Sequence, residues 1–126
     1  MKLLLPLLFL LCATLSHAAT ATPTPTPPAK EIESLLAYVG GLDGAVFIRN
    51  GSEHTAKDAA AHLRTKWEQQ KDQVHTAEDF ITLCAAKSSL SGTPYEIRLK
   101  DGKKLPAETL LRAELLRLRA PKSPPT

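Results

Sequence analysis

Seven polar residues of this chain have side chains suited to holding an anion. They are two arginines, a lysine, a histidine, an asparagine and two serines: Arg49, Asn50, His62, Lys66, Ser89, Ser91 and Arg98. Arginine offers a planar fork of donors to a carboxylate or phosphate, and loop hydroxyls and amides add further donors. His62 and Lys66 are four residues apart, so a helix would place both on one face. If the strands carrying Arg49 and Arg98 pair, the two guanidinium groups would lie at one edge of the sheet, and the set would form a binding site.

The same residues also have ordinary structural explanations. Arg98 would point outward from a half-exposed strand, and His62 would hydrogen-bond a neighbouring loop. Asn50 and Gly51 form a common turn pair, and serines are frequent in loops and caps. Arg49 would form an ion pair with one of three acidic side chains, Glu53, Glu96 or Asp101. Taken singly, each residue is more simply explained by structure than by ligand binding.

A catalytic interpretation is the alternative for the serine-rich loop. A hydrolase needs a nucleophile, a base and an orienting acid, and Ser89 or Ser91 with His62 and Asp79 would supply those residue types. The loop sequence Ser-Ser-Leu-Ser-Gly at 88–92 is not the Gly-x-Ser-x-Gly turn of the α/β-hydrolases. A small envelope hydrolase or an enzyme inhibitor using the Ser88–Ser91 loop is therefore the second hypothesis. We expect no catalytic residues, and a binding protein rather than an enzyme.

Metal, cofactor and nucleic-acid binding find no support in the sequence. His54, His62 and His75 are scattered, without a paired-histidine motif or paired cysteines, so no metal site is expected. No glycine-rich loop follows an expected strand, and no cofactor is predicted. The formal net charge is +3 and charges of both signs are interspersed, which differs from the concentrated basic patch of a nucleic-acid binder.

The first eighteen residues have the pattern of a secretory signal peptide. Lys2 precedes an apolar run at 3–15, and Ser16 and Ala18 provide the small residues of a cleavage site. The run is too short to span a bilayer, which takes about 20 apolar residues. Leu11 before Cys12 does not fit a lipoprotein signal. The sequence thus predicts an exported protein, periplasmic or secreted, with no transmembrane segment after cleavage. Its expected partner is an unknown envelope protein or a small anionic ligand.

The remaining chain divides into a linker, one domain and a tail. Residues 19–29 are rich in threonine and proline and predict an extended linker. Residues 30–120 form the single globular domain, and 121–126 are expected to be a disordered tail. Cys84 is the only cysteine beyond the signal peptide, so an intrachain disulfide is excluded. Its thiol is either buried among apolar side chains or exposed and able to join two chains.

The elements that must position the candidate residues follow from hydrophobic periodicity. Helical spacing predicts helices at 31–39, from 56 to about 71, and from 77 onward, and Thr55 and Thr76 are expected to cap the second and third. A last helix is expected from Pro106, with four leucines on its inner face: Leu110, Leu111, Leu115 and Leu118. Short strands are expected at 45–48 and 95–99. Trp67 and Phe80 are the expected large core residues.

These elements define an α+β fold that is mostly helical, in the order α-β-α-α-β-α. Two strands do not form a stable sheet alone, so we expect a short two-stranded antiparallel sheet covered by the helices. Asn50-Gly51 and Asp101-Gly102 predict tight turns, and no strand is expected after the first of them. Gly40-Gly41 is expected to end the first helix with a left-handed glycine.

Several short motifs in this chain resemble the DUF5329 family of small exported bacterial proteins of unknown function. The motifs are Phe-Ile-Arg-Asn-Gly at 47–51, His-Leu-x-x-Lys-Trp at 62–67, Thr-Ala-Glu-Asp-Phe-Ile at 76–81 and Lys-Ser-Ser-Leu-Ser-Gly-x-Pro-Tyr-x-Ile-Arg at 87–98. The resemblance covers residues 31–119 and implies export but no reaction. Relatives often carry a cysteine just before the first motif, where this chain has Gly44 and Ala45, so the resemblance implies no thiol chemistry there.

Overall fold

The structure is a computed structural model that describes residues 24–121. The predicted signal peptide, the first part of the linker and nearly all of the predicted tail lie outside the described residues. Within 24–121, no helix is both long enough and apolar enough to cross a membrane.

The described part of the chain contains four α-helices and one π-helix. They are α1 (Pro28–Gly40), α2 (Ala56–Gln69), α3 (Ala77–Phe80), the π-helix η1 (Ile81–Ala85) and α4 (Ala107–Arg119). Pro28 and Ala29, which the sequence assigned to the linker, form the first turn of α1, where proline's missing N–H costs nothing. The third predicted helix is α3 running directly into η1.

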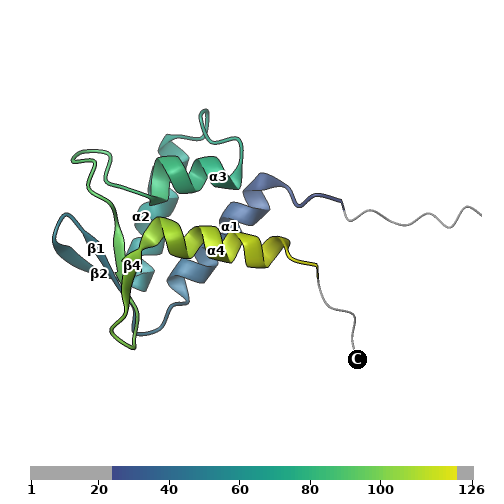
Figure 1. The fold of residues 1–126 in the computed structure, drawn as a ribbon. Coiled ribbons are helices and arrows are strands. Elements are labelled where there is room, and N and C mark those ends of the chain that lie inside the picture. The colour runs from purple at the N-terminus through teal and green to yellow at the C-terminus, as the bar shows by residue number, and fades with distance from the viewer. Residues whose placement is uncertain (1–23, 122–126) are drawn as a thin grey trace, which may run out of the picture.

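The sheet has four antiparallel strands, so the prediction of two strands was wrong. β1 (Val46–Arg49) and β3 (Glu96–Arg98) are the predicted strands and lie in the centre, with the order β2-β1-β3-β4. The additional strands are β2 (Ser52–Thr55) and β4 (Lys104–Pro106). The observed order of elements is therefore α-β-β-α-α-β-β-α, counting α3 and η1 as one helix. Figure 1 shows the strands gathered beside the packed helices.

The two additional strands lack the apolar pattern of a strand because both lie at the edges of the sheet. β2 reads Ser-Glu-His-Thr and is largely exposed, and β4 contains Pro106, which has no N–H to donate. Each pairs with one neighbour through a tight hairpin. Asn50 and Gly51 have φ angles of 51° and 77°, as in a two-residue hairpin turn, so the predicted turn is confirmed but it leads into a strand.

The sheet has one buried face and one exposed face. Phe47 lies opposite Ile97 on β3 and opposite His54 on β2, and alternation puts these three side chains on the face toward the helices. Phe47 and Ile97 are buried. Ile48, the next residue, pairs with Glu53 and Glu96, whose side chains belong to the outer face.

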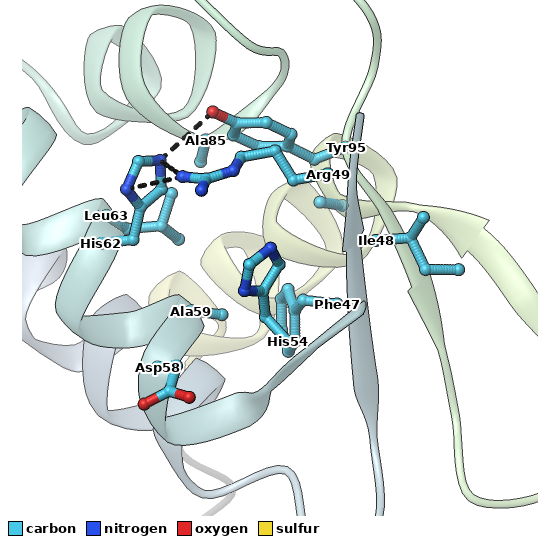
Figure 2. Close-up of a pocket in the computed structure, with 11 residues that line it drawn as sticks. Phe47, Ile48, Arg49, His54, Asp58, Ala59, His62, Leu63, Ala85 and Tyr95 are labelled. Carbon is cyan, nitrogen blue, oxygen red and sulfur yellow. Dashed lines mark hydrogen bonds between the residues drawn. The ribbon is translucent and has the colours of Figure 1, made fainter. Parts of the chain in front are cut away.

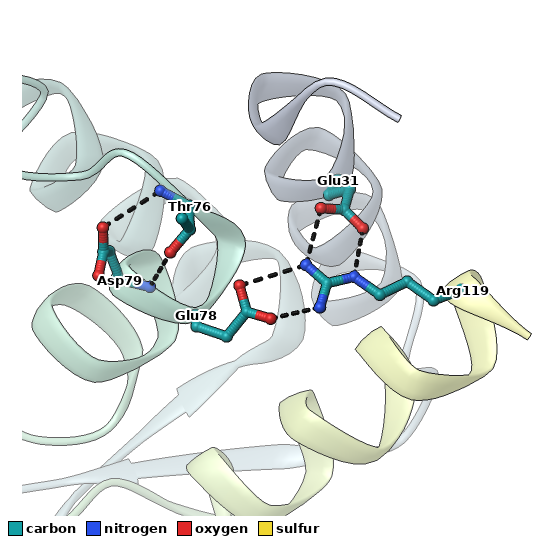
Figure 3. A network of polar contacts seen from close by, with 5 residues as sticks. All are labelled: Glu31, Thr76, Glu78, Asp79 and Arg119. Carbon is teal, nitrogen blue, oxygen red and sulfur yellow. Dashed lines mark hydrogen bonds and ion pairs between the residues drawn. The ribbon is translucent and has the colours of Figure 1, made fainter. Parts of the chain in front are cut away.

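The core confirms both expected anchors. Trp67 from α2 and Phe80 from α3 pack edge to face with ring centroids 6.3 Å apart, and Phe80 is fully buried. Thr76 caps α3 in a complete capping box with Asp79 (Figure 3), and Thr55 caps α2 by accepting from the Asp58 amide. Cys84 is a free, fully buried thiol, so the exposed disulfide-forming alternative is wrong.

Three local expectations differ from the structure. Gly40 is the last residue of α1 and Gly41 has a φ of −92°, so the left-handed residue is instead Gly44, with a φ of 72°. Pro106 precedes α4 as its cap because it still pairs with Glu96 in the sheet. Leu118 is exposed, since the last turn of α4 extends beyond the core.

An ion-pair network joins the end of α4 to the starts of α1 and α3 (Figure 3). The Arg119 guanidinium donates from Nε and Nη2 to Glu31, at 2.7 and 2.9 Å, and also bonds Glu78. Glu31 is 8% exposed, and its charge is matched by this arginine. The network fixes the last helix against two helices that are distant in sequence.

Candidate functional site

Arg49 and His62 lie in direct contact between the sheet and α2 (Figure 2). Arg49 ends β1 on the face toward the helices, and His62 stands on the side of α2 that faces it. Arg49 Nη1 is 2.9 Å from Nδ1 and 2.7 Å from Nε2 of His62. A neutral imidazole has a single acceptor nitrogen, so Arg49 donates to only one of them. Within 24–121, Nη1 is the only atom of this guanidinium with a hydrogen bond.

Tyr95 and Lys66 extend the cluster beyond His62. The Tyr95 hydroxyl lies 3.4 Å from His62 Nε2 and accepts a hydrogen bond from Lys66 Nζ at 3.2 Å. Lys66 also donates to the backbone carbonyl of Lys87 at 3.1 Å, and its ammonium lies 5.0 Å from the centre of the Tyr95 ring. Lys66 is one turn beyond His62 on α2, as predicted, and is only 6% exposed.

The electrostatic surroundings keep His62 neutral. Burial lowers the pKa of His62 below its usual 6.5, and the nearby charges of Arg49 and Lys66 lower that pKa further. A neutral His62 has one acceptor nitrogen for Arg49, and its tautomer decides whether Nδ1 or Nε2 takes that role. The cluster thus contains two cationic side chains, Arg49 and Lys66, and no carboxylate.

Two cavities share three residues of this cluster, Arg49, His62 and Tyr95, as a common wall. The first, which we call the cationic groove, has a volume of 350 Å³ and is lined by Arg49, His62, Lys66 and Tyr95 together with Asn50, Gln69, Gln70 and the 88–90 loop. No acidic residue lines it. The second, the apolar cavity, has a volume of 260 Å³ and continues from Arg49, His62 and Tyr95 toward Phe47, His54 and Ala85 (Figure 2).

Asn50 and the loop serines are joined in a hydrogen-bond network of their own. Asn50 Nδ2 donates to Ser88 Oγ at 3.3 Å, and Ser91 Oγ donates to Asn50 Oδ1 at 2.6 Å. The buried Ser88 hydroxyl also accepts from the amides of Leu90 and Ser91, while Ser89 is exposed at the groove.

These hydrogen bonds of Ser88 and Ser91 stabilise the conformation of the loop. The hydrogen bonds of His62 go to Arg49 and Tyr95 and to no serine of the described chain. The serine–histidine contact that a hydrolase would require is not made.

Arg98 is not part of the cluster. It pairs in register with Val46, whereas Arg49 lies three residues further along β1, and the odd spacing puts the two arginines on opposite faces of the sheet. Arg98 donates to Glu53 at 2.8 Å on the exposed face. The idea that the two arginines share one edge was therefore wrong. So was the expected ion pair of Arg49, since Glu53 pairs with Arg98, Glu96 pairs with Lys104, and Asp101 forms no ion pair with Arg49.

Sequence reasoning missed two residues of this region. Tyr95 is buried and bonds both His62 and Lys66; its type drew attention in the sequence, but its place at the start of an alternating strand kept it out of the predicted site. His54 lines the apolar cavity because β2 pairs it with Phe47. The Asn50-Gly51 turn is the signal that could have placed it, through the hairpin that such turns form.

Fold and site together define a small α+β domain with a cationic groove between its sheet and α2. The chain belongs to a family of unknown function, DUF5329, whose model matches residues 26–119. The resemblance seen in the sequence is thus confirmed. An uncharacterized protein of Salmonella typhimurium, YfeK, is 43% identical over 49 residues, which are 39% of this chain and 41% of that protein. The chain therefore matches about two fifths of the length of this relative. No solved structure matches the chain.

Proposed function

We propose that this protein is an exported binding module that holds the carboxylate or phosphate group of a small ligand in the cationic groove. Arg49 and Lys66 supply the charge, and His62 and Tyr95 position them. Asn50 and Ser89 border the same opening, where Ser89 adds a neutral donor, and Ser91 holds Asn50 in place by donating to its Oδ1. The ligand is a small oxyanion, because the groove volume of 350 Å³ is in the range of small-molecule sites.

One observation carries this proposal: Lys66 is buried without a negative partner. Its ammonium bonds two neutral oxygens, and within 24–121 neither Lys66 nor Arg49 forms an ion pair. Buried charges in proteins are normally paired, because an isolated charge is expensive to remove from water. A bound oxyanion would supply the missing charge. Arg49 still has Nε and Nη2 free to donate to it, in the planar geometry that carboxylates and phosphates accept.

Titration with two simple anions tests the site. Sodium acetate and inorganic phosphate are added to the mature protein at constant ionic strength, with sodium chloride as the reference, and the backbone amide and His62 ring signals are followed by NMR. We expect saturable shifts around Asn50, His62 and Lys66. A bound anion favours the charged imidazole, so the pKa of His62 is expected to rise.

Matched arginine variants connect the binding to the groove. Arg49→Gln is expected to weaken binding at least about tenfold, since it removes a charge-assisted contact. Arg98→Gln removes the same charge from the exposed face of the same sheet and is expected to leave the affinity unchanged. Equal losses in the two variants, or shifts that sodium chloride reproduces, would show general charge screening and contradict the site.

Export is tested separately from binding. The full chain is expressed with its N-terminus intact in a bacterium, and the mature protein is recovered from the periplasm and the medium. The expected N-terminal residue is Ala19, which follows the predicted cleavage site. Recovery of only the uncleaved chain from the cytoplasm would refute export while leaving the ligand site untouched.

A further inference from the structure

His54, which lines the apolar cavity next to the cationic groove, has a buried ring nitrogen without a partner among the described residues. His54 Nε2 is inaccessible to solvent and forms no hydrogen bond within the described chain. Buried side-chain nitrogens are nearly always hydrogen-bonded, and an exception calls for a reason. The ring lies in the cavity wall between α2 and the strands, near Phe47 (Figure 2).

The rest of the cavity wall is mostly apolar. Phe47, Ala59, Leu63, Ala85 and Ala107 contribute to it from β1, α2, η1 and α4. Three of these residues are alanines, and their short side chains are what leaves the space open. The cavity measures 260 Å³, whereas benzene binds in an engineered apolar cavity of about 150 Å³. A benzene ring with one substituent therefore fits the available volume.

The charged residues at the two ends of the adjoining cavities differ in sign, and they would orient a bound anion. Asp58, in the first turn of α2, borders the apolar cavity at the end away from Lys66, and its carboxylate repels an anion there (Figure 2). At the other end, Arg49, His62 and Tyr95 border both cavities. A ligand with its anionic group at Arg49 and Lys66 would direct its remaining atoms toward His54.

We propose that the ligand is an aromatic acid, whose oxyanion lies in the cationic groove and whose ring occupies the apolar cavity, with a polar substituent that bonds His54 Nε2 once the imidazole ring turns to expose this atom to the cavity. This inference rests on the proposed function, and it adds the ligand class. The ring would displace solvent from an apolar wall, and the substituent, a hydroxyl or an amine, would satisfy the orphaned nitrogen.

Three related acids test the inference: acetate, phenylacetate and 4-hydroxyphenylacetate. Phenylacetate is expected to bind at least about tenfold more tightly than acetate, because burial of an aromatic ring favours binding. The hydroxylated acid is expected to bind more tightly still. Nuclear Overhauser contacts from the ring protons to the methyl groups of Ala59 and Ala85 would place the ring directly. Equal affinity for acetate and phenylacetate would overturn the inference.

Two substitutions separate the apolar cavity from the groove. Ala59→Leu fills the cavity and is expected to abolish the preference for phenylacetate while acetate still binds. Ala61→Leu, on the exposed side of the same helix, is its control and is expected to keep the preference. His54→Phe keeps a ring of similar size without nitrogen and is expected to remove only the preference for the hydroxylated acid.

The outcomes distinguish this inference from the proposed function. If acetate binds and Lys66→Met weakens it, but the ring adds nothing or makes no contact with Ala59 and Ala85, the inference fails and the anion site stands. If acetate and phenylacetate bind equally well to wild type and to Lys66→Met, the proposed function fails, and this inference with it. Thermal unfolding of each variant confirms that it is folded before its affinity is interpreted.

Discussion

Two arginines of this domain lie in opposite electrostatic surroundings. Arg119 is held by two carboxylates, Glu31 and Glu78, which raise its pKa further above the range where it loses its proton (Figure 3). Arg49 contacts the His62 imidazole (Figure 2), and the other charged member of the cluster is a second cation, Lys66. Arg119 joins three helices, whereas Arg49 belongs to a cluster in which no carboxylate of the described chain pairs with it.

This contrast separates charges that stabilise the fold from charges that serve a ligand under the proposed function. The Arg119 network has its negative partners within the chain, so it is complete without a ligand. The Arg49–Lys66 cluster places two cations beside a buried tyrosine and has neutral partners only. We expect folding of this cluster to cost free energy that contacts within the described chain do not offset, as in sites that trade stability for binding.

Arg119→Met is the most direct way to break the network. We expect the free energy of unfolding to fall by about 1–2 kcal/mol, because charge-assisted hydrogen bonds are lost and the largely buried Glu31 is left without a partner; partial exposure of Arg119 limits the loss. Urea denaturation measures it. Arg112→Met, which removes an exposed pair with Glu108 on the same helix, is the control and is expected to cost about 0.5 kcal/mol. Equal losses would refute a special role for Arg119.

Lys66→Met tests the other side of the comparison, where removal of a charge is expected to help folding. Methionine keeps the apolar stem and eliminates the unneutralised ammonium, so the free energy of unfolding is expected to be unchanged or to rise by up to about 1 kcal/mol. The same urea measurement applies. A loss as large as that of Arg119→Met would mean that the bonds to Tyr95 and Lys87 build the fold, and the contrast would disappear.

The pH dependence of stability gives the smallest effect and separates the two regions by pH window. The pKa of His62 is lower in the folded state than its usual 6.5, so the unfolded chain takes up the proton first and stability falls as the pH drops below about 6.5. The pKa of Glu78 is lowered from 4.5 by Arg119, so its contribution is present above 4.5 and is lost at more acidic pH. His62→Gln is expected to reduce the loss of stability below about pH 6.5, and Arg119→Met the loss below pH 4.5. The midpoints of urea unfolding at a series of pH values measure both.

The assignment of the upper pH window to His62 and of the acidic window to Arg119 would be contradicted if each variant changed the other window. If His62→Gln left the slope near pH 6 unchanged, His62 would not be the neutral, desolvated group that the geometry implies. Addition of acetate is expected to reduce the same slope in the wild type, since a bound anion stabilises the protonated imidazole.

Local sequence signals predicted the helices well because each carries its own information. The Thr76–Asp79 capping box formed as its spacing indicates, and the spacing of Ala77, Phe80, Ile81 and Cys84 placed all four in the core. His62 and Lys66 share a helix face for the same local reason. The edge strands were missed because their pairing depends on a neighbour: Ser52–Thr55 is polar throughout and becomes a strand only beside β1.

The sequence by itself determined where the helices and the central strands lie to within a few residues, the family, and the residue types of the proposed anion site. Only the tertiary structure decided which of those residues meet. Pairing in register put Arg49 and Arg98 on opposite faces of the sheet, and the packing of α2 against β1 brought His62 and Lys66 to Arg49 and Tyr95. The physical reason is that a strand alternates its side chains with a period of two residues, so a shift of one residue in register exchanges the faces. The spacing of residues along the chain does not reveal the register in which two strands pair.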